Sequence, residues 1–233
     1  MTGSTFPGGT SISRLDVYES EAGDGVCGGT PHMHLVSTEA YVVVGGRGAL
    51  QTIDSSGFAD VPLESGSVVW FTPGTIHRAI NHGDLRVVVL MSNAGLPEAG
   101  DAVMTFPPEV VSDADAYAAA ASLGGDATER SEQRRDLAVL GFSRLREAVQ
   151  NGDGAPLAQF HAAAGRLVAE RAKAWERIVQ DGPLAHAQRS LDLARAVAGG
   201  HVAHLTEGRI SHAVPSPGDR RYGMCGRLRT YDL

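Results

Sequence analysis

The chain has few cysteines and no long hydrophobic run, and each shortage excludes a class of protein. Its 233 residues include two cysteines, Cys27 and Cys225, too few for the disulfide framework of a small secreted domain. We expect both to be reduced thiols, with a single disulfide between them as the alternative. The apolar runs are much shorter than the ~20 residues that span a bilayer, so no membrane helix is expected.

Positive charge is also scarce. Lys and Arg number 20 against 27 Asp and Glu, which gives a net charge of −7 at pH 7. Without a long basic run, neither nucleic acid nor an anionic membrane surface is expected as the main partner. The first ten residues lack both the charged and the apolar region of a signal peptide. We therefore expect a cytoplasmic protein whose partner is a small molecule.

The first part of the sequence, residues 1–108, has the pattern of an antiparallel β-structure. Short β-rich runs alternate with turns that contain glycine, and no helical segment lies between them. This spacing is typical of an all-β sandwich or barrel and argues against a parallel α/β sheet. The runs cover residues 13–20, 33–36, 41–44, 49–54, 68–72, 76–81 and 85–91.

The second part is predicted to be helical over residues 109–207. Apolar residues recur at i, i+3 and i+4, which indicates a short helix and about three amphipathic helices, arranged as a hairpin or a three-helix bundle. These helices are expected over 114–121, 131–150, 156–180 and 183–198. The last segment, 208–233, is rich in glycine and proline and is predicted to be an irregular or weakly β tail that covers the barrel. The helices either cover the barrel mouth, form a dimer interface or only stabilise the fold.

Four side chains in the β-rich part have the spacing of a metal site. His32 and His34 are two residues apart, so on a strand both imidazoles face the same side. Glu39 follows a bend and can return to that side, and His77 follows a Pro-Gly turn. Three imidazoles and one carboxylate suit a single divalent transition metal, namely Fe, Mn, Ni, Co or Zn. One or two coordination positions would remain open for water or substrate.

These spacings resemble the two motifs of the cupin superfamily, G-x5-H-x-H-x(3,4)-E-x6-G and G-x5-P-x-G-x2-H-x3-N. Two positions depart from the motifs: Val26 stands at the first glycine and Thr72 at the proline, and neither is a ligand position. The resemblance covers roughly residues 10–93 and implies a double-stranded β-helix, a jelly-roll barrel with the metal near its open mouth. It also implies a homodimer, whereas residues 109–233 resemble no family that we recognise. The matching positions are His32, His34, Glu39, Gly46, Gly66, Gly74, His77 and Asn81.

Other candidate residues have competing interpretations. Glu39 is a possible proton acceptor, and Tyr41, which shares its strand parity, is either a catalytic residue or a packing residue with a polar end. Asn81 is expected to tie a loop by hydrogen bonds. The pair His201 and His204 has the spacing of half a metal site, but no second pair accompanies it.

The metal site favours an enzyme that acts on a small oxygen-rich molecule such as an enediol, a 2-oxoacid or a diketone. No separate acid/base pair stands out, which favours oxygen chemistry of the dioxygenase type. A non-redox isomerase or lyase is the alternative, and a metal-anchored binding or sensing protein is another. The arginines of the tail are a candidate source of positive charge for an anionic substrate; they are Arg220, Arg221, Arg227 and Arg229.

Overall fold

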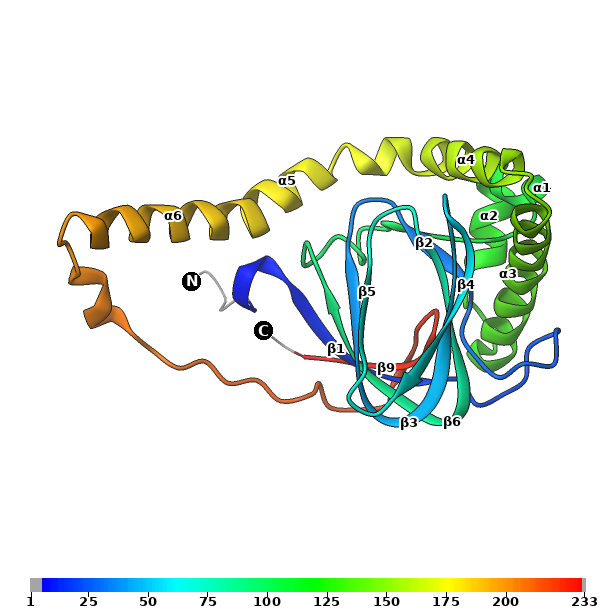
Figure 1. Cartoon of the computed structure of the whole chain (residues 1–233), viewed down its shortest axis with the longest axis horizontal. Coiled ribbons are helices and arrows are strands. Elements are labelled where there is room, and N and C mark those ends of the chain that lie inside the picture. The colour runs from blue at the N-terminus through cyan, green and yellow to red at the C-terminus, as the bar shows by residue number, and fades with distance from the viewer. Residues whose placement is uncertain (1–5, 232–233) are drawn as a thin grey trace.

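Alternating apolar side chains build an antiparallel sheet from the first hundred residues. In strand β1, for example, Leu15 and Val17 are buried while the residues between and before them are more exposed, as a sheet with one covered face requires. The computed structural model describes residues 6–231 of the chain (Figure 1). The strands of this part are β1 (Ser11–Val17), β2 (His32–His34), β3 (Glu39–Asp54), β4 (Gly57–Glu64), β5 (Val68–Phe71), β6 (Ile76–Met91) and β7 (Ala102–Met104).

The two long strands β3 and β6 form the centre of this sheet. They pair antiparallel from Glu39 opposite Met91 to Ile53 opposite Ile76, with bulges around Gly45. The order of strands is β4-β3-β6-β1-β9-β8, while β5 pairs with β3, and β2 pairs with β6 and β7. Gly46 shows why this bend needs glycine: its φ is +69°, and a Cβ there would overlap the Asp84 carbonyl.

The sequence-based division into a sheet-rich first part and a helical second part is confirmed. The helices are α1 (Pro108–Val111), α2 (Ala114–Ala121), α3 (Ala127–Gln150), α4 (Ala155–Ala172), α5 (Trp175–Val179) and α6 (Ala185–Ala198). Helix α3 begins four residues earlier than predicted, because the Asp126 carboxylate caps it by accepting hydrogen bonds from the backbone N–H groups of Thr128 and Glu129. The single helix expected over 156–180 is interrupted between Ala172 and Trp175.

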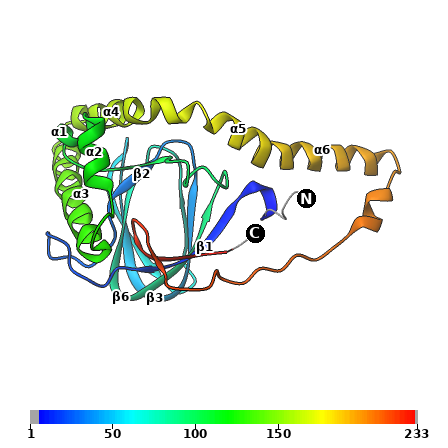
Figure 2. The same ribbon diagram turned by 180° about the vertical axis from the view of Figure 1, so that it is seen from behind.

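Of the two predicted arrangements, a helical hairpin or a three-helix bundle, the described helices do not show the bundle. Helices α3 and α4 pack together and cover the sheet near β2 and β7, where Phe142 and Phe160 join Phe106 in one apolar core. Helices α5 and α6 instead extend away from the sheet, as both views show (Figures 1 and 2). No residue of α6 is buried in the described structure. We call residues 185–219, which include α6 and the segment that returns to the sheet, the arm.

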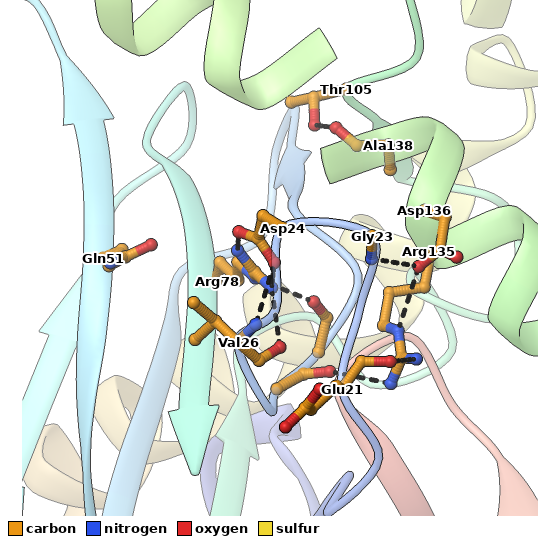
Figure 3. Close-up of polar contacts among 12 residues, drawn as sticks. Glu21, Gly23, Asp24, Val26, Gln51, Arg78, Thr105, Arg135, Asp136 and Ala138 are labelled. Carbon is orange, nitrogen blue, oxygen red and sulfur yellow. Dashed lines mark hydrogen bonds and ion pairs between the residues drawn. The ribbon is translucent and has the colours of Figure 1, made fainter. Parts of the chain in front are cut away.

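Two buried arginines hold the loop that leads into β2 (Figure 3). Arg78, from β6, donates from Nη1 and Nη2 to the two carboxylate oxygens of Asp24 at 2.5 and 3.1 Å. Arg135, from α3, donates to the carbonyl oxygens of Ser20 and Glu21 at 3.0 and 2.7 Å. Helix α3 therefore does more than cover the sheet, because it fixes the loop just before the two histidines of β2.

The tail contains two short strands, in agreement with the weakly β alternative of the prediction. Strand β8 (Arg221–Tyr222) pairs with β9 (Gly226–Thr230), and β9 pairs antiparallel with β1, with Leu228 opposite Leu15. The chain thus returns from the arm and adds a strand to the edge of the first-part sheet. Within residues 6–231, no helix is both long and apolar enough to cross a membrane.

Candidate metal centre

The four residues with metal-site spacing come together on neighbouring strands. His32 lies opposite His77 where β2 pairs with β6, and Glu39 is the first residue of β3. All four side chains are almost completely buried, with exposed fractions of 0–5%. Their candidate ligand atoms all lie within 4.8 Å of one another. Two motifs 45 residues apart in sequence (77 − 32) thus form one cluster.

The Nδ1 atom of each histidine lies against an oxygen atom on the side away from the cluster. His32 Nδ1 lies 2.9 Å from the Thr30 carbonyl oxygen, and His77 Nδ1 lies 3.3 Å from that of Thr75. His34 Nδ1 lies 3.5 Å from the Asp101 carboxylate, a longer contact. An oxygen acceptor at Nδ1 fixes the ring orientation and leaves the Nε2 lone pair free, as metal-binding histidines require.

The opposite ring nitrogens converge on Glu39. His34 Nε2 and His77 Nε2 lie 3.1 and 3.2 Å from Glu39 Oε2. Despite these short distances, His77 Nε2 and Glu39 Oε2 are buried without a well-aligned hydrogen bond. Ligands held about 2.0–2.2 Å from a metal lie roughly 3–4 Å from one another. The residues therefore fit a metal ion, because they place buried donor atoms at such spacings with no other partner to satisfy them.

The charges of the cluster are strongly coupled. Burial lowers the pKa of His32 far below its ordinary value, so this imidazole is neutral. Burial also lowers the pKa of His34, but the neighbouring carboxylates of Asp101 and Glu39 outweigh it and raise the pKa to about 9. Burial raises the pKa of Glu39, yet His34 and His77 lower it well below its usual range. Glu39 is thus a carboxylate, and a divalent cation that binds here would displace the proton of His34.

Asp101 is a functional candidate that the sequence alone did not reveal. It is fully buried, and its carboxylate accepts hydrogen bonds from the backbone N–H groups of Leu35, Val36 and Ser37 at 2.8–3.0 Å. Burial raises the pKa of Asp101, but His34 and Ser37 outweigh it and lower the pKa to about 2. This carboxylate holds both the backbone after β2 and the ring of His34. It lies outside both histidine motifs, so their spacing gave no signal for it.

Tyr41 and Cys225 form a second pair beside the cluster. Tyr41 is fully buried, and its hydroxyl donates to Cys225 Sγ at 3.5 Å. Burial raises the pKa of Tyr41 well above its ordinary value and that of Cys225 to about 12, so both groups are neutral near pH 7. Cys225 comes from the turn before β9, while Cys27 is only half-buried; both are free cysteines.

The remaining candidate residues lie apart from the cluster. Asn81 donates to the Val17 carbonyl and accepts from the N–H groups of Gly83 and Leu85, which confirms its expected role in tying a loop. His201 and His204 are in the arm, where His204 belongs to the short helix Ala203–Glu207. They do not join the metal-site cluster among the described residues.

A cavity of about 190 Å³ opens onto the cluster. His32, His34 and Glu39 line it, while His77 is fully buried behind them. Tyr41 and Cys225 form part of the wall, and the other walls come from β1, β6, β9 and the segment around Glu98. The cavity thus gives a small molecule access to three of the four candidate ligands.

Comparison with known proteins identifies the family of this segment. Residues 19–93 match the sequence model of the Cupin_2 family, described as a cupin domain. This segment is a cupin domain. It contains the four clustered residues and both glycine-bearing turns of the motifs, and it leaves the helices and the tail outside the matched region. No curated protein sequence matches the chain.

Solved structures resemble only part of the chain. PAC13 from Streptomyces, a nucleoside dehydratase also solved with uridine, is 19% identical; the match covers 43% of this chain and 70% of PAC13 in one of those structures, with a TM-score of 0.32. CapF from Staphylococcus aureus, a capsular polysaccharide assembling protein, is 23% identical over 35% of this chain and 22% of its own, with a TM-score of 0.26. WlaRA from Campylobacter jejuni, a TDP-fucose-3,4-ketoisomerase, is 12% identical. The match covers 40% of this chain and 64% of WlaRA, with a TM-score of 0.32.

Proposed function

We propose that the protein is a metal-dependent cupin enzyme that acts on a small oxygen-bearing organic molecule. One observation carries the proposal: His32, His34, Glu39 and His77 gather their candidate ligand atoms within 4.8 Å of one another, and a cavity opens onto three of these residues. His32, His34, Glu39 and His77 would hold one divalent transition metal. Such an ion polarises a bound oxygen atom or, if it is iron, activates dioxygen.

The surrounding residues orient the ligands and control protons. Asp101 keeps the His34 ring turned so that its Nε2 faces the cavity. The Tyr41 hydroxyl is neutral near pH 7 and belongs to a residue of the cavity wall, so it could donate a hydrogen bond to a substrate oxygen if it gave up its contact with Cys225 Sγ. Glu39, in contrast, is already engaged by two imidazoles, which makes it a weaker proton acceptor than a free carboxylate.

We favour dioxygenase-like chemistry because the cavity offers no unengaged acid/base pair next to the cluster. Glu98 also lines the cavity, and this carboxylate favours the alternative, a non-redox isomerase or lyase, because it could accept a proton from a substrate carbon. A binding or sensing protein, in which the metal only anchors a ligand, is the second alternative.

The proposal is tested with protein purified without chelators. We expect about one equivalent of a transition metal per chain by elemental analysis and, in the Fe(II) form, oxygen uptake with a small diketone or 2-oxoacid. Glu39→Gln should lose both the metal and the turnover. Metal binding without turnover of any such compound in air or under nitrogen would favour the sensing alternative. If no metal co-purifies and added metal does not raise the unfolding temperature, the proposal fails.

We also propose that two copies of the chain form a homodimer through the arm. Leu184, just before α6, and Leu191 within it are 57% and 45% exposed. The sheet offers a matching surface, an apolar groove of about 430 Å³ where Val68 and Trp70 of β5 are exposed. If the arm of each copy lies in the groove of the other, both apolar surfaces are buried in one closed two-fold arrangement.

Light scattering of the full chain is expected to give twice the 24.4 kDa of one copy. Leu191→Glu should shift the protein to the monomer, because a buried carboxylate without a partner is costly. Leu140→Glu is the matched control, since Leu140 is equally exposed but lies on α3 outside the arm. A parent protein of single-copy mass, or equal disruption by both variants, would contradict the dimer.

A further inference from the structure

The strand pairing of the tail decides which of its side chains face the cavity. In β9, Leu228 and Thr230 line the cavity, and they lie opposite Leu15 and Ser13 of β1, which line it too. Successive side chains of a strand point to opposite faces of the sheet. Arg227 precedes Leu228, and Arg229 lies between Leu228 and Thr230, so both arginines point to the outer face.

The arginines of the tail are engaged on that outer side. Arg227 lies over the Tyr222 ring, 3.9 Å from its centroid, and donates to the Arg220 carbonyl oxygen at 2.7 Å. Arg229 donates to the Gly218 carbonyl oxygen at 3.3 Å, and Arg220 forms an ion pair with Asp16. Among the described residues that line the cavity there is no arginine, so the structure gives no support to the sequence-based hypothesis that the tail arginines supply positive charge to the substrate. The strand parity alone turns two of them away.

The cavity itself is mainly apolar, and once a metal has displaced the His34 proton it offers no cationic side chain. Leu15, Val89 and Leu228 supply its apolar walls, and neither Lys nor Arg is among the described residues that line it. Beyond the cluster, the carboxyl group among the described wall residues is that of Glu98, an acid. A bound metal would neutralise the group that coordinates it, but it cannot balance a second anion held against these walls. Burying such an anion without a partner is costly.

We propose that the cavity selects ligands with one oxygen-chelating head and an uncharged, apolar remainder, and rejects those with a second anionic group. This inference rests on the proposed metal-dependent function and narrows its substrate class. The volume of about 190 Å³ limits the ligand further, because pockets for drug-sized molecules are typically about 300–1,000 Å³. Phosphorylated sugars and dicarboxylates are excluded, whereas short-chain oxoacids and diketones fit.

Two ligands of similar size, which share the same metal-chelating group, test the inference. Both 2-oxoglutarate and 2-oxo-5-methylhexanoate carry a 2-oxoacid head, but only the first has a second carboxylate. The full chain loaded with Co(II) is titrated with each, and binding is followed by the visible absorption of cobalt. We expect 2-oxo-5-methylhexanoate to bind at least about tenfold more tightly, because its tail leaves no anion against the apolar walls.

Two variants separate the inner from the outer face of β9. Thr230→Arg places a cation at the cavity wall and should strengthen 2-oxoglutarate binding about tenfold, since the second carboxylate gains a partner. Arg229→Ala removes a cation from the outer face and should leave both affinities unchanged. Cobalt content and the unfolding temperature verify that each variant is folded.

Each outcome is decisive. Equal affinity for the two ligands, or weaker 2-oxoglutarate binding in Arg229→Ala, overturns the inference while the metal-dependent function stands. If Co(II) does not bind to the parent chain at all, the proposed function fails, and the inference fails with it. Tighter binding of the apolar-tailed ligand with the expected response of Thr230→Arg supports both.

Discussion

Replacing His77 with alanine is expected to abolish stoichiometric metal binding. His77 is fully buried, and its Nε2 lies 3.2 Å from Glu39 Oε2, with no other group of the cluster able to take its place. Loss of a group that only orients a ligand reduces metal affinity roughly 10–100-fold, so loss of a ligand itself should cost more than 100-fold. The measurement is the metal content of the variant after dialysis, together with the shift of its unfolding temperature on adding Co(II).

The chain provides a matched control for this experiment. His82 lies in the same strand, β6, but is exposed, so His82→Ala should retain the metal and the thermal shift of the parent protein. The His77 ring also packs against Phe71, with centroids 4.2 Å apart, so the variant will lose some stability even without metal. The unfolding temperatures of metal-free parent protein and metal-free His77→Ala protein measure this loss of stability separately. Full metal occupancy in folded His77→Ala protein would remove His77 from the site.

The second large effect is expected at the buried ion pair beside the site. Asp24→Asn should lower the free energy of unfolding by about 2 kcal/mol at pH 7. Breaking a fully buried ion pair costs about 3–5 kcal/mol, and the smaller value is expected here because the Asp24 side chain is 27% exposed. Arg78, in contrast, is 1% exposed, and the substitution leaves its charge without a carboxylate. Urea denaturation of the parent and the variant measures the difference.

The pH dependence of this difference follows from the pKa of Asp24. Burial raises that pKa, but the hydrogen bonds and charge of Arg78 outweigh it and lower it below the ordinary value of 3.8. The ion pair therefore contributes fully above pH 3.8, and the contribution disappears as the pH falls through the lower folded-state pKa. The two proteins should differ at pH 6–8 and converge in more acidic solution.

An exposed ion pair serves as the control for Asp24. Asp84 pairs with Arg86 on the surface, where the two side chains are 69% and 46% exposed. Asp84→Asn should change the free energy of unfolding by less than about 1 kcal/mol, since solvent screens such pairs. A loss of equal size at both positions, or a difference at Asp24 that persists in acid, would show that Arg78 does not depend on this carboxylate.

The metal-site cluster was predictable because its geometry is encoded locally. Two residues of separation put His32 and His34 on one face of a strand, and a turn brings His77 to the strand beside them. Asp101 and Cys225 could not be found in this way. Asp101 reaches the site only through the pairing of β7 with β2, and Cys225 only through that of β9 with β1. Such distant pairings leave no regular spacing in the sequence.

In the helical part, the sequence predicted where helices lie but not what they pack against. The sequence predicted helix α2 over 114–121, which the structure confirms, with Asp113 as the residue that caps it. Apolar periodicity could not reveal what each helix packs against. Leu145 of α3 is buried in the core, whereas Leu191 of α6 is exposed in the arm, although both belong to amphipathic patterns. Packing partners depend on the path of the chain and not on the pattern alone.

The pairing of β9 with β1 also sets an order of events during protein synthesis. The four metal-binding candidates and their strands leave the ribosome first, followed by the helices and the arm, and β9 comes last. The metal centre can therefore assemble while the cavity still lacks the wall made by Leu228 and Thr230. Under the proposed function, metal capture can therefore come before the completion of the ligand-selective cavity.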